Sequence, residues 1–212
     1  MSKSTSQSHG IIIEKRIQEC LGYTDDRNNP TAKFDIPSGY HSSGLPVSVK
    51  APKLGSSIDL ADARRQWTTE DHILIVVEWV QNKEHKTIER ITEILVNEEL
   101  KNAMRGEITF KDVDTFHSDI SLENYPLGEH KNARKFAKLR RSSLLKKAGL
   151  VSLSPKIDSK KQRRLQCSLS QGSYKKILQK YPKNVLGVYS SKNYNGKDIS
   201  KPLLSTKRVF SC

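Results

Sequence analysis

Cysteine is scarce in this chain of 212 residues. Its three cysteines, Cys20, Cys167 and Cys212, stand far apart, with no CxxC pair and no histidine at metal-ligand spacing. This number and spacing argue against a disulfide framework and against a structural zinc site.

Long apolar runs are lacking too. No stretch approaches the roughly 20 apolar residues that span a bilayer, and the start at residues 1–4 has no apolar core like that of a signal peptide. The sequence therefore predicts a cytoplasmic protein without membrane contact. The GxSxG nucleophile turn is also missing, which argues against a Ser/His/Asp hydrolase.

Acidic residues become rare after residue 130. Residues 131–212 hold 22 Lys and Arg against 2 Asp and Glu, whereas residues 1–130 hold 15 against 21, and the whole chain carries a formal charge of +14. Such a concentration of positive charge is typical of a protein that binds a polyanion, because neutralising phosphates releases counterions. Nucleic acid is the expected partner.

A chain of 24.0 kDa is long enough for one well-buried core with a small appendage. We expect a flexible N-terminus over residues 1–9, a catalytic α/β core over residues 10–130 and a basic DNA-recognition region over residues 131–212 packed on that core.

The first half of the chain predicts a sheet with helices. Apolar spacing favours a helix over residues 10–22, short strands over residues 32–37 and 45–51 joined by a glycine-rich turn, and a strand over residues 73–80 that is buried on both faces. A long amphipathic helix is expected over residues 84–105.

The second half predicts a basic helix over residues 131–149 and a β-hairpin with strands at 150–154 and 162–170. Leu165, Cys167 and Leu169 would share one face of the second strand, and Arg164, Gln166 and Ser168 the other. The expected fold class is therefore α/β (α+β), with a central mixed β-sheet flanked by helices.

The segments Phe34-Asp35-Ile36 and Pro46-Val47-Ser48-Val49-Lys50 contain the residues that point to chemistry. Alternate side chains share a face of a strand, so Ser48 and Lys50 point one way and Val47 and Val49 the other. The pattern resembles the PD-(D/E)XK nuclease family, and most of all its type II restriction endonucleases. That resemblance implies a restriction-endonuclease-like fold.

The resemblance also implies roles. Asp35 and the backbone carbonyl of Val49 would hold one or two Mg²⁺ ions, and Lys50 would orient or deprotonate the attacking water. Ser48 stands where the family usually has an acid, so another carboxylate is required. Glu14, at the edge of the apolar stripe of the first helix, is the leading candidate. The alternatives are Asp59, Asp62 and Glu78.

DNA contacts are expected in three places: after the lysine strand, on the basic helix and on the hairpin. The candidates are Arg64, Arg65, Lys138, Arg140, Arg141, Lys160, Lys161, Gln162, Arg163, Arg164 and Gln166. A two-stranded ribbon fits the major groove, where Arg reads guanine and Gln reads adenine. Arg164 and Gln166 are thus the expected base readers, and the lysines and Arg163 are expected to contact phosphate.

The sequence thus favours a Mg²⁺-dependent, sequence-specific endonuclease for double-stranded DNA that acts as a homodimer on a short palindrome. Two alternatives remain: a structure-specific nuclease such as a resolvase, and a nucleic-acid-binding protein without catalysis.

Overall fold

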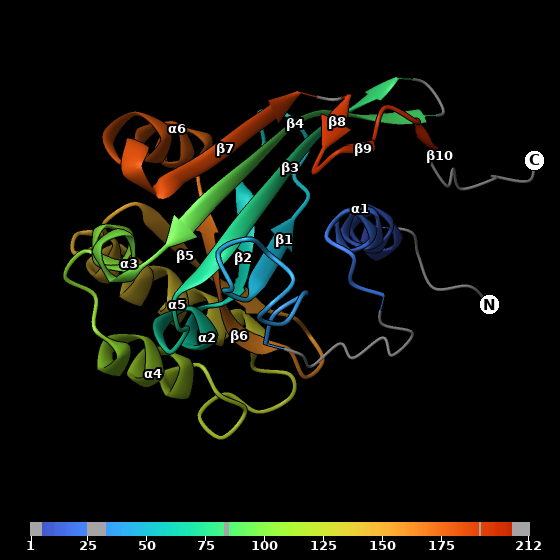
Figure 1. The fold of residues 1–212 in the computed structure, drawn as a ribbon. Coiled ribbons are helices and arrows are strands. Elements are labelled where there is room, and N and C mark those ends of the chain that lie inside the picture. The colour runs from blue at the N-terminus through green and yellow to red at the C-terminus, as the bar shows by residue number, and fades with distance from the viewer. Residues whose placement is uncertain (1–5, 25–32, 83–84, 191, 205–212) are drawn as a thin grey trace, which may run out of the picture. The chain divides into compact units, whose positions relative to one another are not determined.

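The computed structural model describes residues 6–24, 33–82, 85–190 and 192–204. The chain divides into two units (Figure 1). Unit 1 comprises residues 1–56, 71–96 and 183–212, and unit 2 comprises residues 57–70 and 97–182. The predicted boundary at residue 130 coincides with none of the four junctions: residues 57–70 and 97–130 group with most of the basic region, and residues 183–212 group with most of the predicted core.

Unit 1 is built on a mixed β-sheet. Its strands are β1 (Val47–Lys50), β3 (His72–Asn82), β4 (His85–Val96), β7 (Val185–Ser190) and β10 (Leu203–Leu204). Strand β1 runs parallel to β3, β3 is antiparallel to β4, and β7 and β10 both pair antiparallel with β4. The short strands β8 (Asn193–Tyr194) and β9 (Lys197–Asp198) form a separate pair. The prediction of a central mixed sheet with helices is confirmed.

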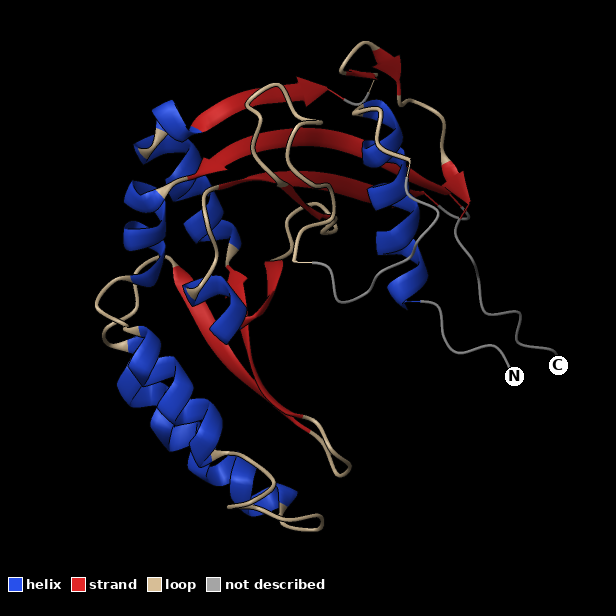
Figure 2. Cartoon of the chain, turned by 60° about the horizontal axis from the view of Figure 1, so that its bottom comes forward, coloured by secondary structure: helices blue, strands red, loops and turns tan. Residues whose placement is uncertain are grey.

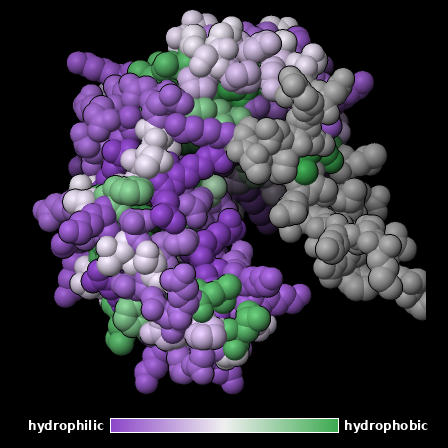
Figure 3. Space-filling model, turned by 90° about the horizontal axis from the view of Figure 1, so that it is seen from below, coloured by the Kyte–Doolittle hydropathy of each residue, from purple (hydrophilic) through white to green (hydrophobic). Residues whose placement is uncertain are grey.

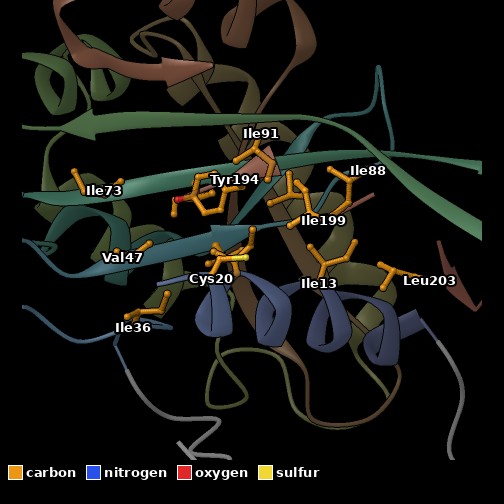
Figure 4. Packing of buried hydrophobic residues seen from close by; sticks show 14 residues of the cluster. Ile13, Cys20, Ile36, Val47, Ile73, Ile88, Ile91, Tyr194, Ile199 and Leu203 are labelled. Atoms are coloured by element: carbon orange, nitrogen blue, oxygen red, sulfur yellow. The ribbon is translucent and has the colours of Figure 1, made fainter. Parts of the chain in front are cut away.

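Helix α1 (Ser6–Cys20) covers one face of this sheet. Its Ile13, Ile17 and Cys20 recur at helical spacing and are buried against residues of β1, β3 and β4 (Figure 4). The opposite face of β3 is also buried, at Leu74 and Val76, as its unbroken apolar sequence predicts. The helix begins at Ser6, before the predicted residue 10; residues 1–5 of the predicted flexible start lie outside the described residues.

The prediction of a long helix over residues 84–105 is wrong. Strand β4 occupies His85–Val96, and only α3 (Glu98–Arg105) is helical. The register between β3 and β4 shifts at one point: Glu78 pairs with Arg90, whereas the next residue, Trp79, pairs with Ile88. Glu89 therefore has no partner in the ladder between these two strands and forms a β-bulge. This bulge brings Ile88 and Ile91 into the same core cluster. Their spacing of three therefore imitates a helix.

The strand predicted over residues 32–37 is reduced to one antiparallel bridge between Ile36 and Val47. Residues 33–35 form a bend, and residues 25–32, where most of the predicted Asp- and Asn-rich loop falls, lie outside the described residues. The predicted reversal of the chain before β1 is nevertheless present, because this bridge is antiparallel.

Unit 2 contains a three-stranded antiparallel sheet and most of the helices. The strands follow the order β2 (Ile58–Asp62), β6 (Arg163–Leu169), β5 (Val151–Ile157). The helices are α2 (Ala63–Trp67), α3, α4 (Phe110–Asp119), α5 (His130–Leu145) and α6 (Gln171–Lys180), and a 3₁₀ turn, η1 (Pro182–Asn184), leads into β7. Strand β2 is not among the elements that the sequence predicts. The predicted basic helix and hairpin are confirmed.

The hairpin extends beyond the third strand. Strand β2 lies beside β6 only from Gln166 to Leu169, so the outer part of β5 and β6 is a two-stranded ribbon. It is the narrow pair of strands that ends in a turn at the bottom of Figure 2.

Helix α5 packs against β5, the edge strand of this sheet. Arg134 donates to the carbonyl of Ile157 at 2.7 and 2.9 Å, and Arg141 donates to the carbonyl of Leu153 at 2.6 Å. These guanidinium groups cover carbonyls of a strand that would otherwise offer them to another chain. No helix within the described ranges is long and apolar enough to cross a membrane.

Candidate functional site

Asp35 is fixed by the start of β1. Its backbone N–H donates to the carbonyl of Val47 at 2.9 Å, and its carboxylate Oδ2 accepts from the backbone N–H of Val49 at 2.6 Å and from the Ser48 hydroxyl at 3.3 Å. From α1, Gln18 donates to the Asp35 carbonyl at 2.8 Å. The aspartate is therefore held from both the strand and the helix.

Lys50 lies next to this carboxylate. Its Nζ is 3.5 Å from Oδ2 of Asp35 and donates to the carbonyl of Val49 at 3.0 Å. Both side chains are 23% exposed, so solvent and a ligand can reach them. The ammonium group thus contacts both oxygen atoms that the sequence assigns to a metal ion.

Glu14 on α1 belongs to the same group of side chains. Burial first, and then the negative charge of Asp35, raise the pKa of Glu14 to about 7, although Lys50 and Lys15 act in the opposite direction. Glu14 is therefore close enough to Asp35 and Lys50 for their charges to act on it. Hydrogen bonds and an ion pair join Asp35, Ser48, the Val49 backbone and Lys50, and Glu14 lies near them on α1, all within unit 1.

The alternative acids have other partners. Glu78 is buried and accepts two hydrogen bonds from Arg90, one of them at 2.7 Å. Asp59 and Asp62 belong to unit 2, where Asp62 caps helix α2 by accepting from the N–H of Arg65. Glu14, in contrast, lies on the helix that packs against β1, and the charges of Asp35 and Lys50 both act on its pKa.

Helix α1 is held by a segment from far along the chain, residues 192–201, which we call the strap. Arg16 donates to the carbonyls of Ile199 and Lys201 at 3.4 and 2.6 Å. At the end of the helix, Asn195 donates to the Cys20 carbonyl at 2.9 Å, and Lys197 donates to that of Glu19. The strap therefore sets the position of the helix that carries Glu14.

A second buried ionisable group, missed by the sequence analysis, centres on Glu93 of β4. Its carboxylate accepts from the hydroxyls of Tyr194 at 2.5 Å and Tyr189 at 3.1 Å, and lies 3.5 Å from Nε2 of His41. Burial raises its pKa, but the hydrogen bonds from His41 and Tyr194, the charge of His41 and the bond from Tyr189 together lower it below the ordinary value. The signal in the sequence was an acid within the apolar run of β4.

His41 lies in the turn between Asp35 and β1, and Ser43 stabilises that turn through contacts with His41 Nδ1 at 2.8 and 3.1 Å. The contact between His41 and Glu93 therefore ties this turn to the central sheet.

The predicted DNA contacts of unit 2 fall into two groups. Apart from Arg64, which is exposed but paired with Asp114, five are exposed: Lys138, Lys160, Lys161, Gln162 and Arg164. Figure 3, which views the molecule from below, shows a surface that is mainly hydrophilic, with separate hydrophobic patches. Exposed lysines on such a surface can meet phosphate without losing a contact within the protein.

The remaining predicted contacts are engaged within unit 2 or half-buried. Arg64 pairs with Asp114 at 2.5 Å, Arg140 lies 3.7 Å from Asp119, and Arg141 binds β5 as described above. Arg65 is half-buried on α2. These arginines have a structural function that sequence reasoning did not include.

Arg163 differs most from its predicted place. It is 8% exposed, lies on the face of Leu165 and Cys167, and donates to the carbonyls of Asp158 and Gln162 at 2.8 and 2.9 Å. Because alternation places Arg163 on the inner face and Arg164 on the outer one, only Arg164 is available at the surface.

Among the described residues, no three or more His, Cys, Asp or Glu side chains gather as metal ligands. The candidate site instead offers two carboxylates and one backbone carbonyl. Hard oxygen atoms of this kind suit Mg²⁺, which retains several waters and needs few protein ligands.

Comparisons of the chain with known protein families, with curated proteins and with solved structures find no match.

Proposed function

We propose that the chain is a Mg²⁺-dependent endonuclease that hydrolyses double-stranded DNA at a specific sequence, as type II restriction enzymes do. The observation that supports this most is the meeting of Glu14, Asp35 and Lys50 beside the Val49 carbonyl, from three separate elements of unit 1. The sequence pattern and the family resemblance predict the same residues.

The donor atoms fit a magnesium ion. Asp35, Glu14 and the Val49 carbonyl would hold it, and the ion would supply charge stabilisation at phosphorus and a more acidic bound water. The negative charge of Asp35 acts on Glu14, and a cation at this place would offset the repulsion between the two carboxylates.

Lys50 and Ser48 have different tasks in this proposal. Lys50 Nζ, between Asp35 and the Val49 carbonyl, would donate a hydrogen bond that orients the attacking water. The Ser48 hydroxyl donates to Asp35, which keeps the carboxylate oriented. Glu14 supplies the second carboxylate that the serine cannot provide.

The basic surface of unit 2 would bind the DNA backbone. Lys138 on α5, Lys160 and Lys161 in the hairpin turn, and Arg164 on β6 are exposed. Lysines in this setting contribute affinity that falls as salt rises, because each phosphate contact releases counterions. We propose a homodimer on a palindromic site, since two-fold symmetry in the protein matches two-fold symmetry in the DNA.

The decisive experiment incubates the protein with phage-sized duplex DNA, with Mg²⁺ or with EDTA, and sequences the fragment ends. Discrete fragments with Mg²⁺ alone, sharing one sequence at their ends, are the expected result. Fragments with unrelated ends, enriched on branched DNA, would favour a structure-specific nuclease instead. Intact but retarded DNA under both conditions would contradict catalysis and leave a nucleic-acid-binding protein.

A further inference from the structure

The outer face of the β5–β6 hairpin presents polar side chains in cross-strand pairs. Lys156 faces Arg164, Ser154 faces Gln166, and Ser152 faces Ser168. Lys156 and Arg164 are exposed, and Ser154 and Gln166 are half-buried. The inner face consists of buried residues such as Leu153, Leu165 and Cys167. The ribbon thus has one apolar face toward its own unit and one face made of hydrogen-bonding groups.

The pair Lys156–Arg164 places two positive charges directly opposite each other on adjacent strands. Like charges in this position destabilise a sheet, and the two exposed lysines of the turn, Lys160 and Lys161, add to the repulsion. An anion near this face offsets the repulsion. A nucleic-acid duplex can do so along the whole ribbon, because its phosphate charges repeat at regular intervals along the groove. Charge complementarity therefore favours nucleic acid as the occupant of the face.

Gln166 is oriented by an acid from a third strand. Its Nε2 donates to Oδ2 of Asp59 on β2. A carboxylate can only accept, so the amide nitrogen of Gln166 must face Asp59. One amide hydrogen is used in this bond, and the second hydrogen and Oε1 remain side by side as a donor and an acceptor.

Asp59 is itself fixed by a β-bulge. The register of β2 with β6 shifts between Asp59 and Ala61, Ala61 has a positive φ of 71°, and its N–H donates to Oδ1 of Asp59 at 2.8 Å. Bulges often aim a side chain out of the regular pattern of a sheet. Here the bulge and the Oδ1 bond leave Oδ2 of Asp59 directed at Gln166.

We infer that Asp59 is a positioning residue that sets the amide of Gln166 to read adenine in the major groove of duplex DNA, while Arg164 reads a guanine. Adenine presents N7 as acceptor and N6–H₂ as donor, which matches the free hydrogen and Oε1 of an oriented glutamine; guanine N7 and O6 match a guanidinium. Arg164 and Gln166 lie two residues apart, roughly 6.6 Å along the strand, so the two bases are expected within about two base-pair steps. This inference rests on the DNA-binding part of the proposed function and not on cleavage.

The test is selection of binding sites from a library of randomised 20-base-pair duplexes. The full chain carrying Lys50→Ala is the parent, so that bound DNA stays intact. We expect enrichment of sites with a guanine and an adenine close together. Gln166→Ala should lower discrimination at the A·T pair roughly 5- to 150-fold, and Arg164→Ala should do the same at the G·C pair.

Asp59→Asn separates positioning from general stability. Asparagine donates as well as accepts, so both orientations of the Gln166 amide become possible. Discrimination should fall at the A·T pair alone, and by less than in Gln166→Ala. The variant should keep the melting temperature of the parent protein and its affinity for unselected DNA. Lys175→Ala, which removes an exposed charge on α6, is the control and should leave the preference intact.

The inference is overturned if Gln166→Ala and Asp59→Asn keep the profile of the parent, if they alter different base pairs, or if the parent enriches no duplex or prefers single-stranded RNA. Cleavage by the wild-type chain is scored separately. If binding sites are enriched but the wild-type chain does not cleave DNA, the nuclease proposal fails and this inference stands. If the wild-type chain cleaves at a specific site and neither variant changes the preferred sequence, the nuclease proposal stands and this inference fails.

Discussion

The two units use their charged side chains in opposite ways. Unit 1 turns several of its acids inward: Glu14, Asp35, Glu78 and Glu93 are buried or half-buried and lie against Lys50, Arg90 or His41. Unit 2 holds most of the basic stretch that begins at residue 131, and many of its lysines are exposed. Charges buried close together change one another's chemistry, whereas exposed charges act on a distant polyanion. In the proposed function, bond breaking would therefore take place in unit 1 and DNA binding in unit 2.

The largest effect is expected from removing the site in unit 1. Asp35→Ala and Lys50→Ala should each lower the cleavage rate about 10³-fold, because they remove the metal ligand and the group that orients the water. DNA affinity measured with EDTA should stay within about threefold. Lys53→Ala removes an exposed charge three residues from Lys50 and is the matched control. Cleavage at the wild-type rate by either site variant would show that the chemistry lies elsewhere.

Removing charge from unit 2 should produce the complementary result. With Lys156, Lys160 and Lys161 all changed to alanine, we expect the slope of log affinity against log salt to decrease by about 3, since each phosphate contact contributes about 0.9. The melting temperature should not change. A triple variant of exposed lysines in unit 1, at positions 53, 183 and 192, serves for comparison. Equal losses for both triple variants would contradict the division of labour.

Glu93, a buried acid of unit 1, should contribute to stability in a pH-dependent manner. Glu93→Gln is expected to lower the free energy of unfolding by about 2 kcal/mol, because a charged acceptor of several hydrogen bonds is lost. The folded pKa of Glu93 lies below its ordinary value of 4.5, so this contribution is fully present above about pH 4.5 and is lost as the pH falls through the folded pKa. Denaturant titrations from pH 3 to 8 measure it.

The control for that series is Glu89→Gln, at the exposed bulge residue of the same strand. A difference between wild type and Glu93→Gln that grows as the pH falls below 4.5 would contradict the assignment of the low pKa.

The smallest effect concerns the bulge of β2 in unit 2. Ala61 has a φ of 71°, which costs an L-residue more than it costs glycine. Ala61→Gly should therefore raise the free energy of unfolding, by about 0.5 kcal/mol after the entropy of glycine is counted. In contrast, Ala103→Gly within α3 should lower it by about 1 kcal/mol. Chemical denaturation of both variants gives the two signs.

The sequence predicted which side chains lie close together in unit 1 better than it predicted some elements of the fold. Ser48 and Lys50 share a face of one strand, Asp35 precedes that strand by a short turn, and Glu14 follows from the stripe of one helix, because these patterns are local. The strand β4 was mistaken for a helix, since the bulge at Glu89 gives Ile88 and Ile91 a spacing that both structures allow. A bulge depends on the partner strand, which the local pattern does not contain.

The functions of the arginines were equally hidden. Arg134 and Arg141 bind carbonyls of β5, and Arg163 is buried, although in the sequence they resemble their exposed neighbours. A guanidinium suits phosphate and backbone carbonyl alike, so its type alone does not decide between them. Only the packing of α5 against β5 and the inward face of β6 show which arginines are occupied.

The strap has a consequence for the order in which the chain is made. Arg16 and Cys20 on α1 are bound by residues 183, 185 and 175 positions later. When Glu14, Asp35 and Lys50 leave the ribosome, the residues that bind α1 have therefore not yet been synthesised. Contacts between residues so far apart in the sequence form after most of the local ones, because closing the long intervening loop costs the most conformational entropy. During synthesis, completion of the candidate site is thus deferred until residues 192–201 have been made.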